Sequence, residues 1–141
     1  MVILVDTNVI LDVILMRDEF ISDSYRVMRL CYEEASGVEG YAAAHTIPNL
    51  WYILRKYFKP VERRENILDV FEVLDIVPFN GEMLQTALKN FEFNDFEDCL
   101  QDECAVAVGA DYIVTNNVKD FANSRTPALT PEEFIAKFAR N

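Results

Sequence analysis

Acidic and amide side chains follow the first apolar segment of this chain without a spacer. Residues 2–5 are an uninterrupted apolar run, and Asp6, Thr7 and Asn8 come directly after it. A short run without alternation is typical of a strand buried on both faces, and ligands of open α/β sheets bind just beyond the carboxyl ends of such strands. A carboxylate there is costly unless it binds something, and a metal ion is the simplest partner. The alternative is that Asp6 only caps the next helix.

A second group of carboxylates lies between residues 94 and 102. Asp95, Asp98 and Asp102 are spaced i, i+3 and i+7, which predicts that they share one face of a helix over 95–108. The helix dipole favours acids in the first turn, so it explains Asp95 and Glu97, and in part Asp98, without any function, but it explains Asp102 less well. A structural and a functional interpretation of this cluster therefore both stay open.

A second predicted strand, over 111–115, also ends in polar groups. Thr115, Asn116 and Asn117 close it, and Asp120 follows after a short turn. Turn chemistry alone accounts for such residues. However, two strands and one helix then present acids or amides to the same crevice. Magnesium takes oxygen ligands, keeps some of its waters and needs only two or three carboxylates, and such a site can activate water for displacement at phosphorus.

The elements that must position these groups alternate along the chain. Strands are predicted over 2–5, 40–44, 74–79, 111–115 and 128–129. Helices are predicted over 8–15, 23–36, 81–90 and 95–108, with others capped by Thr46, opened by Pro60 and begun by Thr130. Alternating strands and helices imply a parallel sheet with right-handed crossovers. We therefore expect an α/β fold in which a central parallel sheet of about four to five strands is flanked by helices, as one domain over residues 1–141.

Composition favours a globular protein of the reducing cytoplasm. Apolar residues make up 51% of the 141 residues and aromatic residues 12%, which argues against disorder. No apolar run approaches the roughly 20 residues that span a bilayer, and the N-terminus lacks the pattern of a secretory signal. The three cysteines, Cys31, Cys99 and Cys104, are odd in number and lack zinc-type spacing. We expect them to be small buried hydrophobic residues, and we expect no membrane segment.

The net charge of −11 opposes the usual electrostatic signature of a nucleic-acid-binding protein. Divalent ions can neutralise a local acidic cluster, and a short basic stretch can contact phosphates. The best such stretch is residues 55–59, with Arg63 and Arg64 close behind, in which basic and aromatic residues interleave. A solvated helix face is the simpler interpretation of this stretch.

Together these segments resemble the PIN-domain family of metal-dependent ribonucleases, whose members include toxins of VapBC-type toxin–antitoxin pairs. The resemblance is carried, in order and spacing, by residues 5–12, 95–101, 114–121 and 130–134. It implies that the catalytic residues are Asp6, Asp98 and Asn117, and that these three, with Asp95 as a weaker candidate, bind the metal. Asp120 is a further weak candidate, and the resemblance gives Thr7 and Thr115 a part in orienting ligands or water.

The resemblance implies an Mg²⁺- or Mn²⁺-dependent endoribonuclease that hydrolyses RNA phosphodiester bonds, as the toxin of a toxin–antitoxin pair. The implied partners are an RNA substrate, an antitoxin protein and a second copy of the chain. One position departs from the family: many members carry a glutamate where this chain has Asn49. An amide can coordinate a cation but cannot ionise, so the site should hold metal less tightly. The alternative is therefore a catalytically weak or inactive PIN-like module that binds RNA or protein.

Other kinds of active site fit the sequence less well. The single histidine, His45, has no partner that would form a catalytic triad, so a structural role is the simpler prediction, and no phosphate-binding glycine loop is present. Haloacid-type phosphatases require a second aspartate where this chain has Asn8. Receiver domains require an acidic residue next to the first-strand aspartate, and Asp6 has none.

Overall fold

The computed structural model describes residues 1–16 and 21–138 of the chain. Within these residues five strands form one sheet in the order β3-β2-β1-β4-β5, and all four neighbouring pairs are parallel. The strands are β1 (Val2–Val5), β2 (Glu39–Ala43), β3 (Asp75–Val77), β4 (Tyr112–Val114) and β5 (Ala128–Leu129). The predicted parallel sheet of four to five strands is confirmed.

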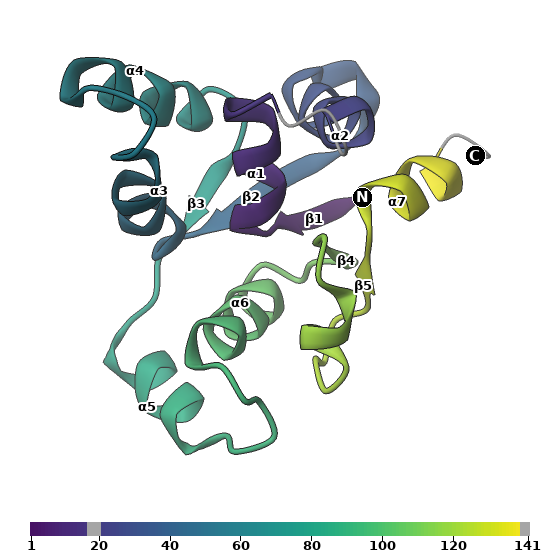
Figure 1. The fold of residues 1–141 in the computed structure, drawn as a ribbon. Helices are drawn as coiled ribbons and strands as arrows, with labels where there is room; N and C mark the ends of the chain where they lie inside the picture. The colour runs from purple at the N-terminus through teal and green to yellow at the C-terminus, as the bar shows by residue number, and fades with distance from the viewer. Residues whose placement is uncertain (17–20, 139–141) are drawn as a thin grey trace.

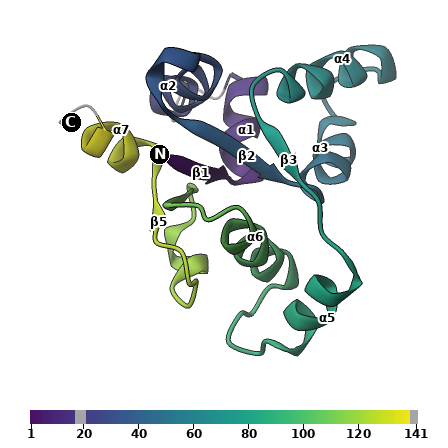
Figure 2. The same ribbon diagram turned by 180° about the vertical axis from the view of Figure 1, so that it is seen from behind.

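Helices cover both faces of this sheet (Figures 1 and 2). In the described part of the chain they are α1 (Thr7–Ile14), α2 (Ile21–Tyr32), α3 (Thr46–Leu54), α4 (Pro60–Phe71), α5 (Gly81–Lys89), α6 (Phe96–Ala107) and α7 (Pro131–Phe138). Helices α5 and α6 pack against each other on one face, and α1, α2, α3, α4 and α7 lie on the other. None of the described helices has both the length and the hydropathy that crossing a membrane requires.

The uninterrupted apolar sequence of β1 follows from its central place in the sheet. Ile3 and Val5 belong to the core cluster beneath α1 and α2, whereas Leu4 belongs to the cluster beneath α5 and α6. All three side chains are fully buried. Because successive side chains of a strand point to opposite faces, a strand covered on both faces must be apolar at every position.

Helix boundaries follow local signals in most cases. Pro60 occupies the first turn of α4, and the Asn80 side chain caps α5 by accepting a hydrogen bond from the backbone amide of Met83. The strand predicted over 74–79 is shorter in the structure, at Asp75–Val77, and two helix predictions were wrong. Helix α2 ends at Tyr32, so the predicted helix over 23–36 is too long, and a separate 3₁₀ turn occupies Glu34–Ser36. The cap residue of α3 is His45 rather than Thr46, whose hydroxyl bonds elsewhere.

The strand order creates a crevice above the middle of the sheet. From β1 the chain adds β2 and then β3 on one side, and it later returns to add β4 and β5 on the other side of β1. The order in which strands are added therefore reverses between β1 and β4. Open α/β sheets bind ligands at such a point of reversal. Asp6 and Thr115 each follow one of these two strands directly.

Candidate functional site

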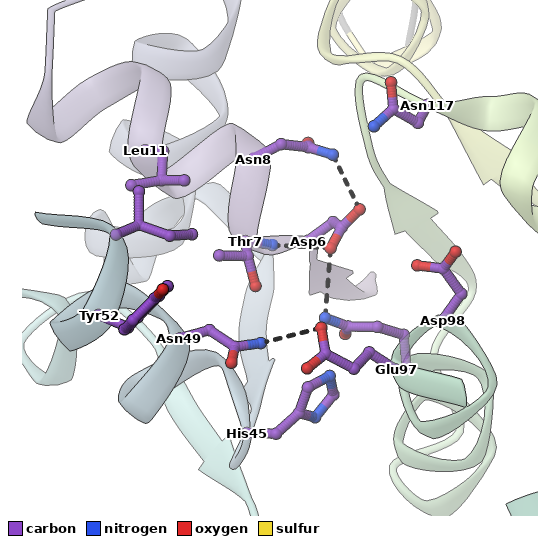
Figure 3. A pocket seen from close by; sticks show the side chains of 12 residues that line it. Asp6, Thr7, Asn8, Leu11, His45, Asn49, Tyr52, Glu97, Asp98 and Asn117 are labelled. Carbon is purple, nitrogen blue, oxygen red and sulfur yellow. Dashed lines mark hydrogen bonds between the residues drawn. The ribbon is translucent and has the colours of Figure 1, made fainter. Parts of the chain in front are cut away.

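A pocket of about 390 Å³ opens at the carboxyl ends of β1 and β4 (Figure 3). We call it the acidic pocket. It brings together three residues predicted from the sequence, namely Asp6, Asp98 and Asn117, and Asp98 lies across the pocket from Tyr52 (Figure 3). The residues that line it are Asp6, Thr7, Asn8, Leu11, His45, Asn49, Tyr52, Ile53, Glu97, Asp98, Gln101 and Asn117.

Four hydrogen-bond donors from three parts of the chain hold the Asp6 carboxylate. Its Oδ1 accepts from the backbone amide of Thr7 at 2.8 Å and from Nε2 of Gln101 at 3.2 Å. Its Oδ2 accepts from the hydroxyl of Thr115 at 2.8 Å and from Nδ2 of Asn8 at 3.0 Å. The hydrogen bond from the Thr7 amide caps the N-terminus of α1, so the interpretation of Asp6 as a helix cap is correct but incomplete. A helix cap does not require the further donors on α6 and at the end of β4. These donors fix the orientation of the carboxylate.

Burial and hydrogen bonding act in opposite directions on Asp6. Its side chain is 8% exposed, and burial raises the pKa of its carboxyl above the ordinary value. The hydrogen bonds from Thr115, Thr7 and Asn8 oppose that rise, because they favour the charged form. A nearby cation would favour the charged form further.

Asp98 reaches the acidic pocket from the first turn of α6. Burial is the largest cause that raises the pKa of its carboxyl to about 7, and the negative charges of Asp95, Asp6, Asp120 and Glu97 add to it. Carboxylates that repel one another in this way gain when a divalent cation enters between them. The electrostatics of the pocket therefore favour a cation.

The other two aspartates of α6 do not line the acidic pocket. Asp95 precedes the helix and caps it, accepting a hydrogen bond from the amide of Asp98 at 3.0 Å. Asp102 is 1% exposed and accepts from the hydroxyl of Ser124 and from the backbone amide and Nε of Arg125. The structural interpretation therefore holds for Asp102, which anchors the segment before β5.

Asn49, at the position where the family resemblance predicts a glutamate, lies on α3 in the wall of the acidic pocket. Its Nδ2 donates to Oε2 of Glu97 at 3.3 Å, across the pocket from α3 to α6 (Figure 3). The chain thus brings a carboxylate to the neighbourhood of Asn49 from another helix. The sequence interpretation assigned Glu97 only to the helix dipole and missed this contact.

Gln101 and Thr46 are further residues that sequence reasoning missed. Gln101 is 2% exposed, and its Nε2 donates to Asp6 and, at 3.5 Å, to the hydroxyl of Thr46. The hydroxyl of Thr46 also lies 2.9 Å from that of Thr7. Oε1 of Gln101 is buried and has no hydrogen-bond partner among the described residues. The available signal was a glutamine among the apolar residues 99, 100, 104 and 105, where a buried amide needs partners.

His45 also lies in the pocket wall, in a partly apolar setting. Its ring packs against Phe79 with centroids 6.0 Å apart. Burial lowers the pKa of His45 below its ordinary value, so the ring is neutral at pH 7. A neutral ring adds no positive charge that would compete with a cation in the pocket.

The donor set fits a hard divalent cation that keeps part of its water shell. Among the described residues, no three His, Cys, Asp or Glu side chains lie close enough together to hold a metal ion unaided. The pocket instead offers the carboxylates of Asp6 and Asp98 and the amide of Asn117. The unpartnered Oε1 of Gln101 can accept a hydrogen bond from a coordinated water.

A family model described as the PIN domain matches residues 2–119, which is most of the chain. The chain belongs to the PIN domain family. PIN domains are generally nucleases that depend on divalent metal ions. The curated proteins include no match to this PIN domain.

Solved structures share the fold of this PIN domain at low sequence identity. One is VapBC2 from Rickettsia felis bound to a DNA fragment from their promoter, with a TM-score of 0.69, 20% identity and coverage of 92% of this chain and 98% of that chain. Another is PAE2754 from Pyrobaculum aerophilum, with a TM-score of 0.62, 17% identity and full coverage of both chains. These likenesses support the fold assignment.

Proposed function

We propose that this PIN domain, extending over residues 1–141, is an Mg²⁺- or Mn²⁺-dependent endoribonuclease that hydrolyses RNA phosphodiester bonds. The observation that carries the proposal is that Asp6 and Asp98, 92 positions apart in the sequence, line one pocket at the point where strand order reverses. Family membership supports nuclease activity in general, and the choice of RNA as substrate is part of this proposal.

Asp6 and Asp98 would hold the cation, and Asn117 would complete or orient its ligand set. When bound, the cation would polarise the phosphodiester and lower the pKa of an attacking water. Thr115, Asn8 and Gln101 hold the Asp6 carboxylate in one orientation, so little reorganisation accompanies binding. Asp95 caps the N-terminus of α6 and thereby positions Asp98.

Glu97 would supply the negative charge that Asn49 lacks. The two side chains touch in the acidic pocket, and the glutamate reaches it from α6 instead of α3. An ionised carboxylate near the cation stabilises it whichever helix it comes from, because the Coulomb interaction depends on distance and not on sequence position.

The direct test is cleavage of a labelled single-stranded RNA with Mn²⁺ and with Mg²⁺. We expect metal-dependent cutting that Asp6→Asn and Asp98→Asn each reduce by at least about a hundredfold, since each removes a charged ligand. Asp75→Asn, which removes one exposed carboxylate on β3, is the matched control and should cut normally. Undiminished cutting by both pocket variants would rule out the assignment.

The alternative, a catalytically weak PIN module, is favoured by Asn49 and by the net charge of −11. It predicts no cleavage of any RNA and no metal-induced rise in Tm. A rise of several degrees at millimolar Mg²⁺ would count against it, because a ligand that binds only the folded state stabilises that state.

We further propose that the protein acts in the cytoplasm as the toxin of a toxin–antitoxin pair and forms a homodimer. Support for the antitoxin comes from the Rickettsia felis relative, whose structure is of a VapBC2 complex. The homodimer rests on analogy with the family alone. Co-expression with the product of the neighbouring gene, followed by co-purification and measurement of mass, tests both partners.

A further inference from the structure

The positive charge of this acidic protein is concentrated in the turn between α3 and α4 and at the start of α4. Residues 51–64 contain five of the 13 basic residues of the chain and one of its 24 acidic residues. We call these five the basic strip: Arg55, Lys56, Lys59, Arg63 and Arg64. All of them except Arg63 are exposed. A local excess of four positive charges on a chain with a net charge of −11 points to a specific anionic partner.

Three arginines of the basic strip stack on aromatic rings. The guanidinium carbon of Arg55 lies 3.6 Å from the centroid of the Tyr52 ring. The guanidinium carbons of Arg63 and Arg64 lie 4.0 Å and 5.3 Å from the centroid of the Trp51 ring. Such stacking orders guanidinium groups that would otherwise move freely, and ordered guanidinium planes both bind phosphates and stack with nucleobases.

The basic strip begins at the rim of the acidic pocket. Tyr52 lines that pocket and carries Arg55 on its ring. Trp51 precedes Tyr52 in α3 and lies about 100° around the helix from it. The two arginines of α4 stack on the Trp51 ring. The stacked arginines therefore extend from Tyr52 at the acidic pocket to Trp51 on the same helix and to α4.

We propose that the basic strip is the binding track for single-stranded RNA next to the bond that is cut. This inference rests on the proposed nuclease function and names how its substrate is held. Anionic phosphates would be repelled by the rest of the surface and attracted along the strip. Exposed aromatic rings and guanidinium planes suit unstacked bases, whereas a duplex keeps its bases inside. An acidic protein segment is the competing occupant.

The test measures RNA affinity separately from cleavage. Fluorescence anisotropy with a labelled single-stranded 12-mer RNA is recorded in an Asp6→Asn background, in which cutting is blocked. Arg55→Gln/Arg64→Gln removes two exposed charges of the strip. The matched control, Lys89→Gln/Lys137→Gln, removes two charges from α5 and α7, and α7 lies at the opposite end of the molecule from α4 (Figures 1 and 2).

We expect the strip variant to lose affinity about tenfold or more, while the control binds as before. The slope of log affinity against log salt should fall by about 1.4, since each lost phosphate contact of a single strand contributes about 0.7. Lys56→Gln and Lys59→Gln, as single variants, should weaken binding in the same direction. Equal affinity and equal salt slope in the strip variant and the control would overturn the track.

The two proposals fail in different ways. Metal-dependent cleavage that Arg55→Gln/Arg64→Gln leaves unchanged would overturn the track and leave the nuclease proposal standing. Strip-dependent RNA binding by a protein that never cuts RNA would overturn the nuclease proposal instead. Loss of a protein partner in the strip variant, with RNA affinity unaltered, would assign the strip to that partner and also overturn the track.

Discussion

Nε2 of Gln101 lies 3.2 Å from Oδ1 of Asp6, across 95 positions of sequence. This bond ties the middle of α6 to the end of β1 and adds a fourth donor to one buried carboxylate. The other end of the same amide, Oε1, is a buried acceptor that has no partner within residues 1–16 and 21–138. Gln101 thus orients Asp6 with one atom and offers an acceptor to the acidic pocket with the other.

Replacing Gln101 by methionine keeps the volume of the side chain and removes both functions of its amide. We expect the apparent Mn²⁺ affinity to fall about tenfold, within the 10- to 100-fold range for groups that orient metal ligands. Isothermal titration calorimetry measures this. Gln85→Met, at an exposed position of α5, is the control. Unchanged affinity in Gln101→Met would show that the amide serves packing alone.

Asp98 and Asp102 lie on the same helix, and we expect opposite effects from replacing them. Asp102→Ala leaves Arg125 and Ser124 without their acceptor and should lower the free energy of unfolding by about 2 kcal/mol, less than for a fully buried pair because Arg125 is half exposed. Its Mn²⁺ affinity should persist. Asp98→Ala should abolish metal binding at little cost in stability. Denaturant unfolding and calorimetry on both variants check these expectations. Metal binding that is lost in Asp102→Ala but kept in Asp98→Ala would show that the roles of the two aspartates are reversed.

The raised pKa of Asp98 predicts how the metal-free protein responds to pH. Its pKa is about 7 in the folded protein, against an ordinary value of 3.8. As the pH rises, the unfolded chain therefore loses this proton before the folded protein does. The contribution of the protonated carboxyl to the free energy of unfolding is fully present below about pH 4 and is lost as the pH rises through about 7. In EDTA, Asp98→Asn should have a higher Tm than the unaltered protein at pH 8, and the difference should shrink towards pH 5. An equal or lower Tm at pH 8 would contradict the cost of burying the charged Asp98 carboxylate beside other acids.

The contact between Asn49 and Glu97 predicts that the two positions can exchange roles. Glu97→Gln should weaken Mn²⁺ binding several-fold, because it removes a negative charge near the cation. Adding Asn49→Glu to that variant should restore the affinity, since the charge returns from the opposite helix. Glu132→Gln, an exposed acid in the first turn of α7, is the control. Failure of the double variant to recover would indicate that Glu97 does not act through charge at this site.

The sequence was sufficient to predict features that depend on local pattern. The apolar run of β1, the proline that opens α4 and the alternation of strands with helices predicted the parallel sheet correctly. It also predicted that Asp6, which follows β1, and Asp98, in the first turn of α6, would face the same crevice, and both line the acidic pocket.

Features that depend on tertiary contacts could not be predicted in the same way. Spacing along α6 predicted that Asp98 and Asp102 share one helix face, but it could not reveal that the partner of Asp102 is Arg125, 23 positions later. The bond from Gln101 to Asp6 and the bond from Asn49 to Glu97 join different elements of the fold. No helical or strand period relates residues that far apart, so only the packed structure reveals these pairs.

Anomalous diffraction from crystals grown with Mn²⁺ tests the central claim most directly, because it locates the cation itself. We predict one strong peak in the acidic pocket, with a carboxylate oxygen of Asp6 and one of Asp98 each about 2.1 Å from it. The absence of a peak at saturating Mn²⁺, or a peak that contacts only one of these two carboxylates, would contradict the account.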